Sequence, residues 1–199
     1  MVSRPIIAGV LAGLAFGQPA HGLVVGAILE VFALVILPFG AARYPESGTA
    51  AAAAAAAYSQ TAPSIIDQRL LLLAIVFALA WEQIAGASVV FMRRVNERIA
   101  AVAPAGPDVA AEVTRRQILG FGIDALRGAC AVVLGAVLGT FLLRSFSPHI
   151  AISSGVSAQF LMIGTMGMLG AVLSLFGGMK ERKFAYTAGL ACGALVLLL

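Results

Sequence analysis

Long apolar stretches separated by short polar connections dominate the chain, and they predict helices rather than strands. Most of these stretches reach about twenty residues, which is the length that a helix needs to cross the hydrocarbon core of a bilayer. The apolar segments lie at roughly residues 5–16, 22–42, 64–92, 117–146, 155–178 and 184–199. The pattern therefore predicts an all-α, polytopic membrane protein with six hydrophobic segments.

The N-terminal segments are predicted to include broken or re-entrant helices. Residues 5–16 are too few to span a bilayer, and they end at a Gly-Gln-Pro break. The second segment is interrupted near its end by Pro38 and Gly40, which predicts a kinked or unwound last turn. An unbroken alanine run follows at 50–57. Because alanine is the best helix former, this run predicts a helix that packs against others or re-enters the bilayer.

Composition and charge support membrane insertion and orient the loops. The chain is 61% hydrophobic and 11% charged, whereas soluble domains carry roughly 25% charged residues. Basic residues cluster at 93–116 and 180–183, so the positive-inside rule predicts that both loops are cytoplasmic. These loops account for most of the basic residues behind the net charge of +4, and no aromatic-interleaved basic patch accompanies them. We therefore expect no nucleic-acid partner.

Glu30 stands in the middle of the second apolar segment and is the first candidate for a functional residue. An ionisable group at membrane depth is costly unless it faces protein or water. Gly22, Gly26 and Glu30 follow one another at four-residue spacing, so they share one helix face. Since small residues line helix contacts in membranes, the carboxylate is expected to point into the protein.

Further polar residues inside or beside the apolar segments extend the candidate set. Carboxylates and amides bind the hydroxyls of neutral sugars, but they also relay protons or bind cations. Several have simpler interpretations: Asp124 and Arg127 can pair with each other on one helix, Asp67 can cap a helix, and Glu46 can be a loop acid. The full set is Gln18, Glu30, Glu46, Asp67, Glu82, Gln83, Asp124 and Arg127.

The histidines and cysteines carry no expected chemistry. His21 and His149 each stand alone and are expected to be solvated turn residues. Cys130 and Cys192 lie in apolar stretches without ligand spacing, and they are expected to be small buried residues. The chain has no phosphate-binding loop, zinc-protease, serine-hydrolase or dinucleotide-binding motif. We expect no metal, no cofactor and no catalytic residue.

The first forty-six residues resemble the IIC permease subunit of mannose-family phosphotransferase systems, which includes mannose, fructose and sorbose types. That family has an RP motif with a basic residue, a glycine turn, a GxxxGxxxE segment and a GAAxxPD exit. Weaker similarity continues through 82–100, 124–127 and 164–175. The matching residues are Arg4, Pro5, Gly17, Gly22, Gly26, Glu30, Gly40, Ala41, Ala42 and Pro45.

The resemblance implies a subunit that binds a sugar near the membrane midplane and moves it by alternating access. A IID membrane subunit would complete the permease, and soluble IIA and IIB components would supply the phosphoryl group. The complex would lie in the cytoplasmic (inner) membrane of a bacterium. Glu30 is the expected hydroxyl ligand at the base of the site. The further expected contacts are Gln18, Glu46, Gln83, Asp124 and Arg127.

The resemblance also organises the chain as one membrane-embedded permease domain, 1–199. Residues 1–63 would form a broken-helix sugar-site motif. Residues 64–199 would supply transmembrane helices, with the basic cytoplasmic loop near 93–116.

Some positions depart from the family and leave other functions open. Gln18 and Glu46 stand where the family usually has Asp, residues 38–39 replace a usual Asn, and no helix precedes the RP motif. One alternative is a non-transporting structural or sugar-sensing subunit of the same lineage. The other is an ion-coupled carrier that uses Glu30 and Asp124.

Overall fold

The structure is a computed structural model, and it describes residues 3–34, 45–63, 65–101, 109–149 and 152–175. Within these ranges the chain is helical, without a strand, so the all-α prediction is confirmed. The elements are α1 (Pro5–Ala15), α2 (Pro19–Leu34), α3 (Ser47–Thr61), α4 (Gln68–Ala101), α5 (Val109–Phe146), a 3-10 turn η1 (Ser147–His149) and α6 (Ser154–Leu175). The interruption expected at residues 38–40 and the sixth segment expected at 184–199 lie outside the described residues.

The helices fall into two length classes. Among the described elements, α4, α5 and α6 are long and apolar enough to cross a membrane. By contrast, α1, α2 and α3 have 11, 16 and 15 residues, or about 16, 24 and 22 Å of helix, against about 30 Å of hydrocarbon core. The chain is therefore an integral membrane protein, and the short helices predicted near its N-terminus are present.

Close glycine contacts join α1 and α2 into a tight hairpin. Gly17 makes the turn with φ 70°, a left-handed conformation that glycine adopts at no steric cost. A Cβ at Gly9 would lie 2.6 Å from the carbonyl oxygen of Gly22 and 2.9 Å from Cα of Gly26. The packing expected for these glycines is confirmed. On α6, by contrast, a Cβ at Gly167 would meet no described atom within 4 Å.

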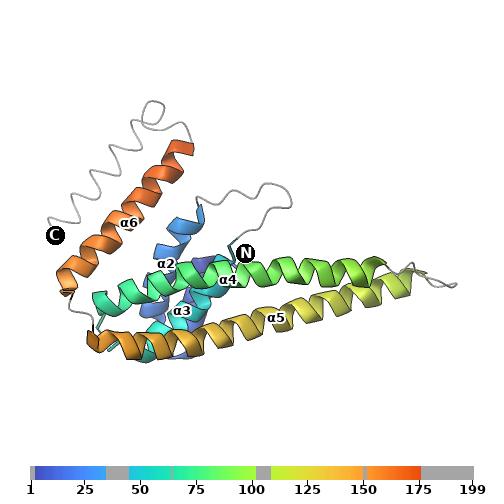
Figure 1. Cartoon of the computed structure of the whole chain (residues 1–199), viewed down its shortest axis with the longest axis horizontal. Helices are drawn as coiled ribbons and strands as arrows, with labels where there is room; N and C mark the ends of the chain where they lie inside the picture. Colours follow the sequence, from blue (N-terminus) through green and yellow to red (C-terminus); the bar gives the residue numbers. More distant parts are fainter. Residues whose placement is uncertain (1–2, 35–44, 64, 102–108, 150–151, 176–199) are drawn as a thin grey trace.

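Helix α3 forms the core of the molecule. Its alanine run at 50–57 is almost entirely buried, and α3 packs against α1, α2, α4 and α5 (Figure 1). Glycines on α5 make room for the alanines: a Cβ at Gly135 would lie 2.8 Å from Cβ of Ala53, and one at Gly139 2.9 Å from Cβ of Ala57. The alanine run is thus a helix packed against others, as its sequence predicts.

Helices α4 and α5 form a long pair that continues past the other helices (Figure 1). Trp81 holds the pair together where it passes α3, because its indole N–H donates to the carbonyl oxygen of Ala131 at 3.2 Å. Helix α6 packs against α2 and α4. The core of α1–α3 therefore rests on one half of the α4–α5 pair, and the other half projects beyond it.

Candidate functional site

Arg127 on α5 is the centre of a polar cluster inside the apolar part of the bundle. Its Nη1 and Nη2 donate to the two carboxylate oxygens of Glu46, each at 2.9 Å. Its Nε donates to Oδ1 of Asp124 at 2.7 Å, and Nη1 also donates to Oγ of Ser88 at 2.9 Å. Only 15% of the Arg127 side chain is exposed. A bidentate, charge-assisted pair of this kind fixes both partners in direction as well as distance.

Glu46 is held in place by its backbone. It immediately precedes α3, and its N–H donates to the carbonyl oxygen of Glu82 on α4 at 3.1 Å. Its side chain makes no capping bond to α3 and pairs with Arg127 instead. The Glu82 side chain is buried, and its Oε1 accepts a hydrogen bond from Nε2 of Gln83 at 3.4 Å. The cluster therefore joins α4, α5 and the start of α3.

Glu30 faces the interior, as its glycine spacing predicts, and it has protein partners there. Its Oε2 accepts from the backbone N–H of Ile6 at 3.3 Å, and its Oε1 lies 3.1 Å from Nη1 of Arg4. The first N–H groups of a helix lack intrahelical acceptors and carry the positive end of its dipole. The carboxylate therefore caps α1 from the neighbouring helix.

The two acidic groups lie at one end of the short helices. A Cβ at Gly48, in the first turn of α3, would lie 2.9 Å from the carbonyl carbon of Ser3, just before α1. The N-termini of α1 and α3 are therefore side by side, with Glu30 at one and Glu46 at the other. Short helices whose N-termini meet at a polar site are typical of transporter binding sites.

Gln18 lies at the opposite end of the hairpin. It follows α1, where its N–H donates to the carbonyl oxygen of Gly13 at 2.8 Å and its own carbonyl accepts from Gly22 at 3.2 Å. With 11 residues, α1 places Gln18 about 16 Å from the Arg4–Glu30 pair. Of the expected site residues, Glu46, Asp124 and Arg127 are in contact. Glu30 pairs with Arg4 instead, Gln83 is exposed on α4 beside Glu82, and Gln18 lies apart.

Two residues that make these polar contacts, Ser88 and Arg4, are not among the candidate site residues predicted from the sequence. Ser88 is a short hydroxyl residue in an apolar helix, and its Oγ also donates to the carbonyl oxygen of Ala85 at 2.6 Å. Such helix-internal serines are common in membranes, so no local signal distinguishes Ser88. The RP motif includes Arg4, but it does not indicate that Arg4 pairs with Glu30.

The isolated polar residues have mixed outcomes. Asp67 caps α4 as expected, because its Oδ1 accepts from the N–H of Arg69 at 2.9 Å. His149 is exposed in the turn η1, also as expected. The prediction for His21 is wrong: it is 1% exposed on α2, its ring lies edge-on to Tyr58 at 5.0 Å, and neither ring nitrogen has a partner among the described residues.

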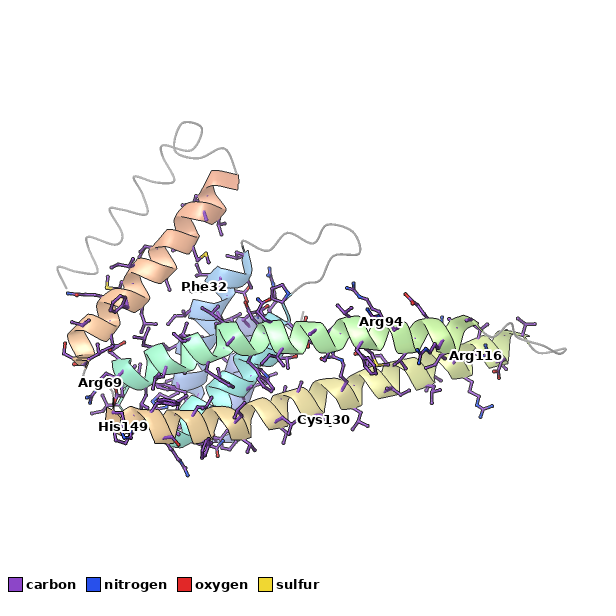
Figure 2. All side chains as sticks on the ribbon, in the orientation of Figure 1. Phe32, Arg69, Arg94, Arg116, Cys130 and His149 are labelled. Carbon is purple, nitrogen blue, oxygen red and sulfur yellow. The ribbon has the colours of Figure 1, made fainter. Side chains whose placement is uncertain are left out.

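Cys130 also differs from its prediction, because it is exposed on α5 (Figure 2). An apolar position in a membrane helix can face lipid or another subunit as readily as the protein interior, so hydropathy alone did not establish burial. Cys192 lies outside the described residues.

Comparison with known families identifies the protein class. A family model described as the PTS system sorbose-specific IIC component matches residues 1–177. The chain belongs to this family. The match covers the six α-helices among the described residues and every residue of the polar cluster, and it confirms the resemblance seen in the sequence. The chain gives no match to curated proteins or to solved structures.

Membership defines a general role for the chain. IIC components are membrane permease subunits of sugar phosphotransferase systems, and they work in association with the other components. As a class they are not the catalytic subunits. The polar cluster thus lies in the membrane-embedded part of a sugar-specific permease.

Proposed function

We propose that this IIC subunit binds its sugar at the Arg127–Glu46 cluster and moves it across the membrane by alternating access. The observation that carries the proposal is the bidentate pair of Arg127 and Glu46, at 2.9 Å for each bond, beside two short-helix N-termini. A guanidinium that donates and a carboxylate that accepts are complementary to neighbouring hydroxyls of a neutral sugar.

A sugar that binds at this cluster would have to replace existing hydrogen bonds. In the structure, Arg127 donates to Glu46, Asp124 and Ser88 together. A sugar would exchange the Glu46 bonds for its own hydroxyls, which donate to the carboxylate and accept from the guanidinium. Asp124 would remain paired with Arg127, and the sugar hydroxyls would replace the hydrogen bonds that the Glu46 carboxylate loses.

The other expected contacts occupy different levels of the protein. Glu30, on α2, would accept a hydrogen bond from a sugar hydroxyl. Gln83 would reach the sugar from α4, beside Glu82. Gln18 would meet the sugar at another step of transport, at the opposite end of the α1–α2 hairpin.

The remaining components complete the system. A IID membrane subunit would form the permease with this chain, in an oligomeric complex within the inner membrane of a bacterium. Soluble IIA and IIB components would supply the phosphoryl group on the cytoplasmic side. The basic cluster around 93–116 supports that side for the α4–α5 loop.

Reconstituted vesicles test the function. We expect vesicles that contain the chain and its IID partner to accumulate sugar phosphate when phosphorylated IIB is present, with sorbose, mannose and fructose as probes. Uptake that needs an ion gradient and no phosphodonor would identify an ion-coupled carrier. Sugar binding without any accumulation would identify a sensor or structural subunit.

A further inference from the structure

The far ends of α4 and α5 extend out of the membrane. The apolar part of α4 ends at Met92, after 25 residues or about 37 Å of helix, which already exceeds the hydrocarbon core of about 30 Å. Residues 93–101 continue the helix, and residues 109–116 of α5 run beside them. Figure 2 shows Arg94 and Arg116 on this projecting end, where no other described helix is present.

The projecting end is basic. Its two described ranges, 93–101 and 109–116, contain five arginines and two glutamates, for a net charge of +3. Arg116 braces the two helices: its Nε donates to Oε1 of Glu112 at 2.8 Å, and its Nη1 donates to the carbonyl oxygen of Ile99 at 3.3 Å. Arg98 and Arg115 are exposed to solvent. The positive charge is thus carried on a braced helical pair.

A groove runs between the two helices at this end. It has a volume of about 460 Å³, and apolar side chains form much of its lining. Val113 is 41% exposed and Val109, one turn away, is 47% exposed, although both lie beyond the apolar span. Both valines precede the apolar segment that begins near residue 117, so a protein partner is better placed than lipid chains to cover them. The lining includes Asn96, Ile99, Ala100, Val113, Gly120 and Phe121.

The groove and the polar cluster lie on the same face of α5. Val113, Gly120 and Arg127 recur every seven residues, so they lie on one face of the helix. Gly120 lines the groove, and Arg127 lies two turns further, about 10 Å along the helix axis. A partner seated in the groove would therefore lie over the cytoplasmic side of the cluster.

We propose that this groove and its arginines dock the phosphorylated soluble component that serves the permease. This inference rests on the proposed function, which requires such a component on the cytoplasmic side. A phosphoryl group and acidic side chains complement the net charge of +3, and an apolar side chain of the partner would fill the groove. Anionic lipid could reach the arginines nearest the membrane, but it would not cover Val109 and Val113.

Charge reversal tests the electrostatic half of the proposal. The chain and its IID partner are placed in nanodiscs of neutral lipid, and the affinity for purified phosphorylated IIB is measured by fluorescence anisotropy. We expect Arg98→Glu/Arg115→Glu to weaken binding at least tenfold, since two favourable charges become repulsive. Arg144→Glu, at the other end of α5, is the matched control and is expected to keep wild-type affinity.

A pair of glycine substitutions tests the groove itself. Within 4 Å, a Cβ at Gly120 would meet only the Asn96 side chain, at 3.1 Å, whereas one at Gly122 would meet no described atom. Gly120→Leu fills the groove without changing charge, and we expect it to weaken IIB binding. Gly122→Leu places the same side chain on another face of α5 and is expected to have no effect.

Sugar binding, measured on the same samples, separates this inference from the proposed function. Wild-type IIB affinity in both Arg98→Glu/Arg115→Glu and Gly120→Leu, with sugar binding intact, would overturn the docking site alone. If the substitutions weakened binding to anionic vesicles but left IIB affinity unchanged, this face would bind lipid, and the docking site would also be overturned. Failure of the wild-type complex to bind any probe sugar would instead contradict the proposed function.

Discussion

The guanidinium of Arg127 and the carboxylate of Glu46 are 81 residues apart in sequence and meet through two hydrogen bonds of 2.9 Å. This pair joins the start of α3 to the middle of α5. Because α3 is the packed core of the bundle, the pair links the position of the core helices to the long helix pair. If the sugar binds here as proposed, the pair would couple sugar binding to helix movement.

Breaking the pair from one side should destabilise the protein. Arg127→Met leaves the carboxylates of Glu46 and Asp124 without their cation. Removing one partner of a fully buried ion pair costs about 3–5 kcal/mol, and the cost here should be smaller because Glu46 and Asp124 are 26% and 49% exposed. We expect a clear fall in the thermal unfolding midpoint in detergent. Glu46→Gln/Arg127→Met should recover part of that fall but not sugar affinity. If the double variant were no more stable than Arg127→Met, the pair would not be the source of the loss.

Glu30 can be tested for its two roles separately. Glu30→Gln keeps an oxygen that accepts from Ile6 but loses the charge that pairs with Arg4. Because Arg4 is half exposed, the lost pair should cost no more than about 1 kcal/mol. We expect Glu30→Gln to leave stability nearly unchanged and to weaken sugar binding. Glu30→Ala should lower both the stability and the sugar affinity. Unchanged affinity in both variants would show that Glu30 is only a helix cap.

Glycine substitution should separate the hairpin contact from an open surface. Gly9→Ala places a Cβ 2.6 Å from a backbone oxygen of α2, and overpacking of this kind costs about 1–3 kcal/mol. Gly167→Ala on α6 meets no described atom within 4 Å, and it should be neutral or slightly stabilising through helix propensity. Equal unfolding midpoints for the two variants would contradict the close contact of α1 and α2.

His21 should be replaceable by an apolar residue. A buried polar group without a partner costs about 1–3 kcal/mol, so we expect His21→Leu to keep or raise the unfolding midpoint. His149→Leu, in an exposed turn, serves as the control and should change little. A marked loss of stability in His21→Leu alone would mean that its ring has a favourable partner.

Local spacing predicted some of this arrangement well. The four-residue spacing of Gly22, Gly26 and Glu30 correctly placed that carboxylate toward the interior, because a single helix determines its direction. The spacing of Asp124 and Arg127 likewise anticipated their ion pair, which the structure contains. The short helices followed from segment length and from the Gly-Gln-Pro break.

Other features depend on contacts that no local pattern encodes. Glu46 meets Arg127 only because α3 packs against both α4 and α5. The hydropathy pattern does not determine which helices pack together in a membrane. The prediction of burial failed for a similar reason, because the hydropathy of an apolar helix does not show which of its faces contacts lipid. The sequence predicts a solvated His21 in a turn and a buried Cys130, and the structure reverses both.

The central claim is that Arg127 binds the sugar, and one affinity measurement tests it directly. Sorbose, mannose and fructose are titrated into the complex of the chain with its IID partner, in wild type, Arg127→Lys and Arg144→Lys. Lysine keeps the charge but loses the bidentate geometry. We expect Arg127→Lys to weaken binding roughly tenfold or more, equivalent to about 1.4 kcal/mol, and Arg144→Lys to match wild type. Equal affinity in all three proteins would contradict the claim.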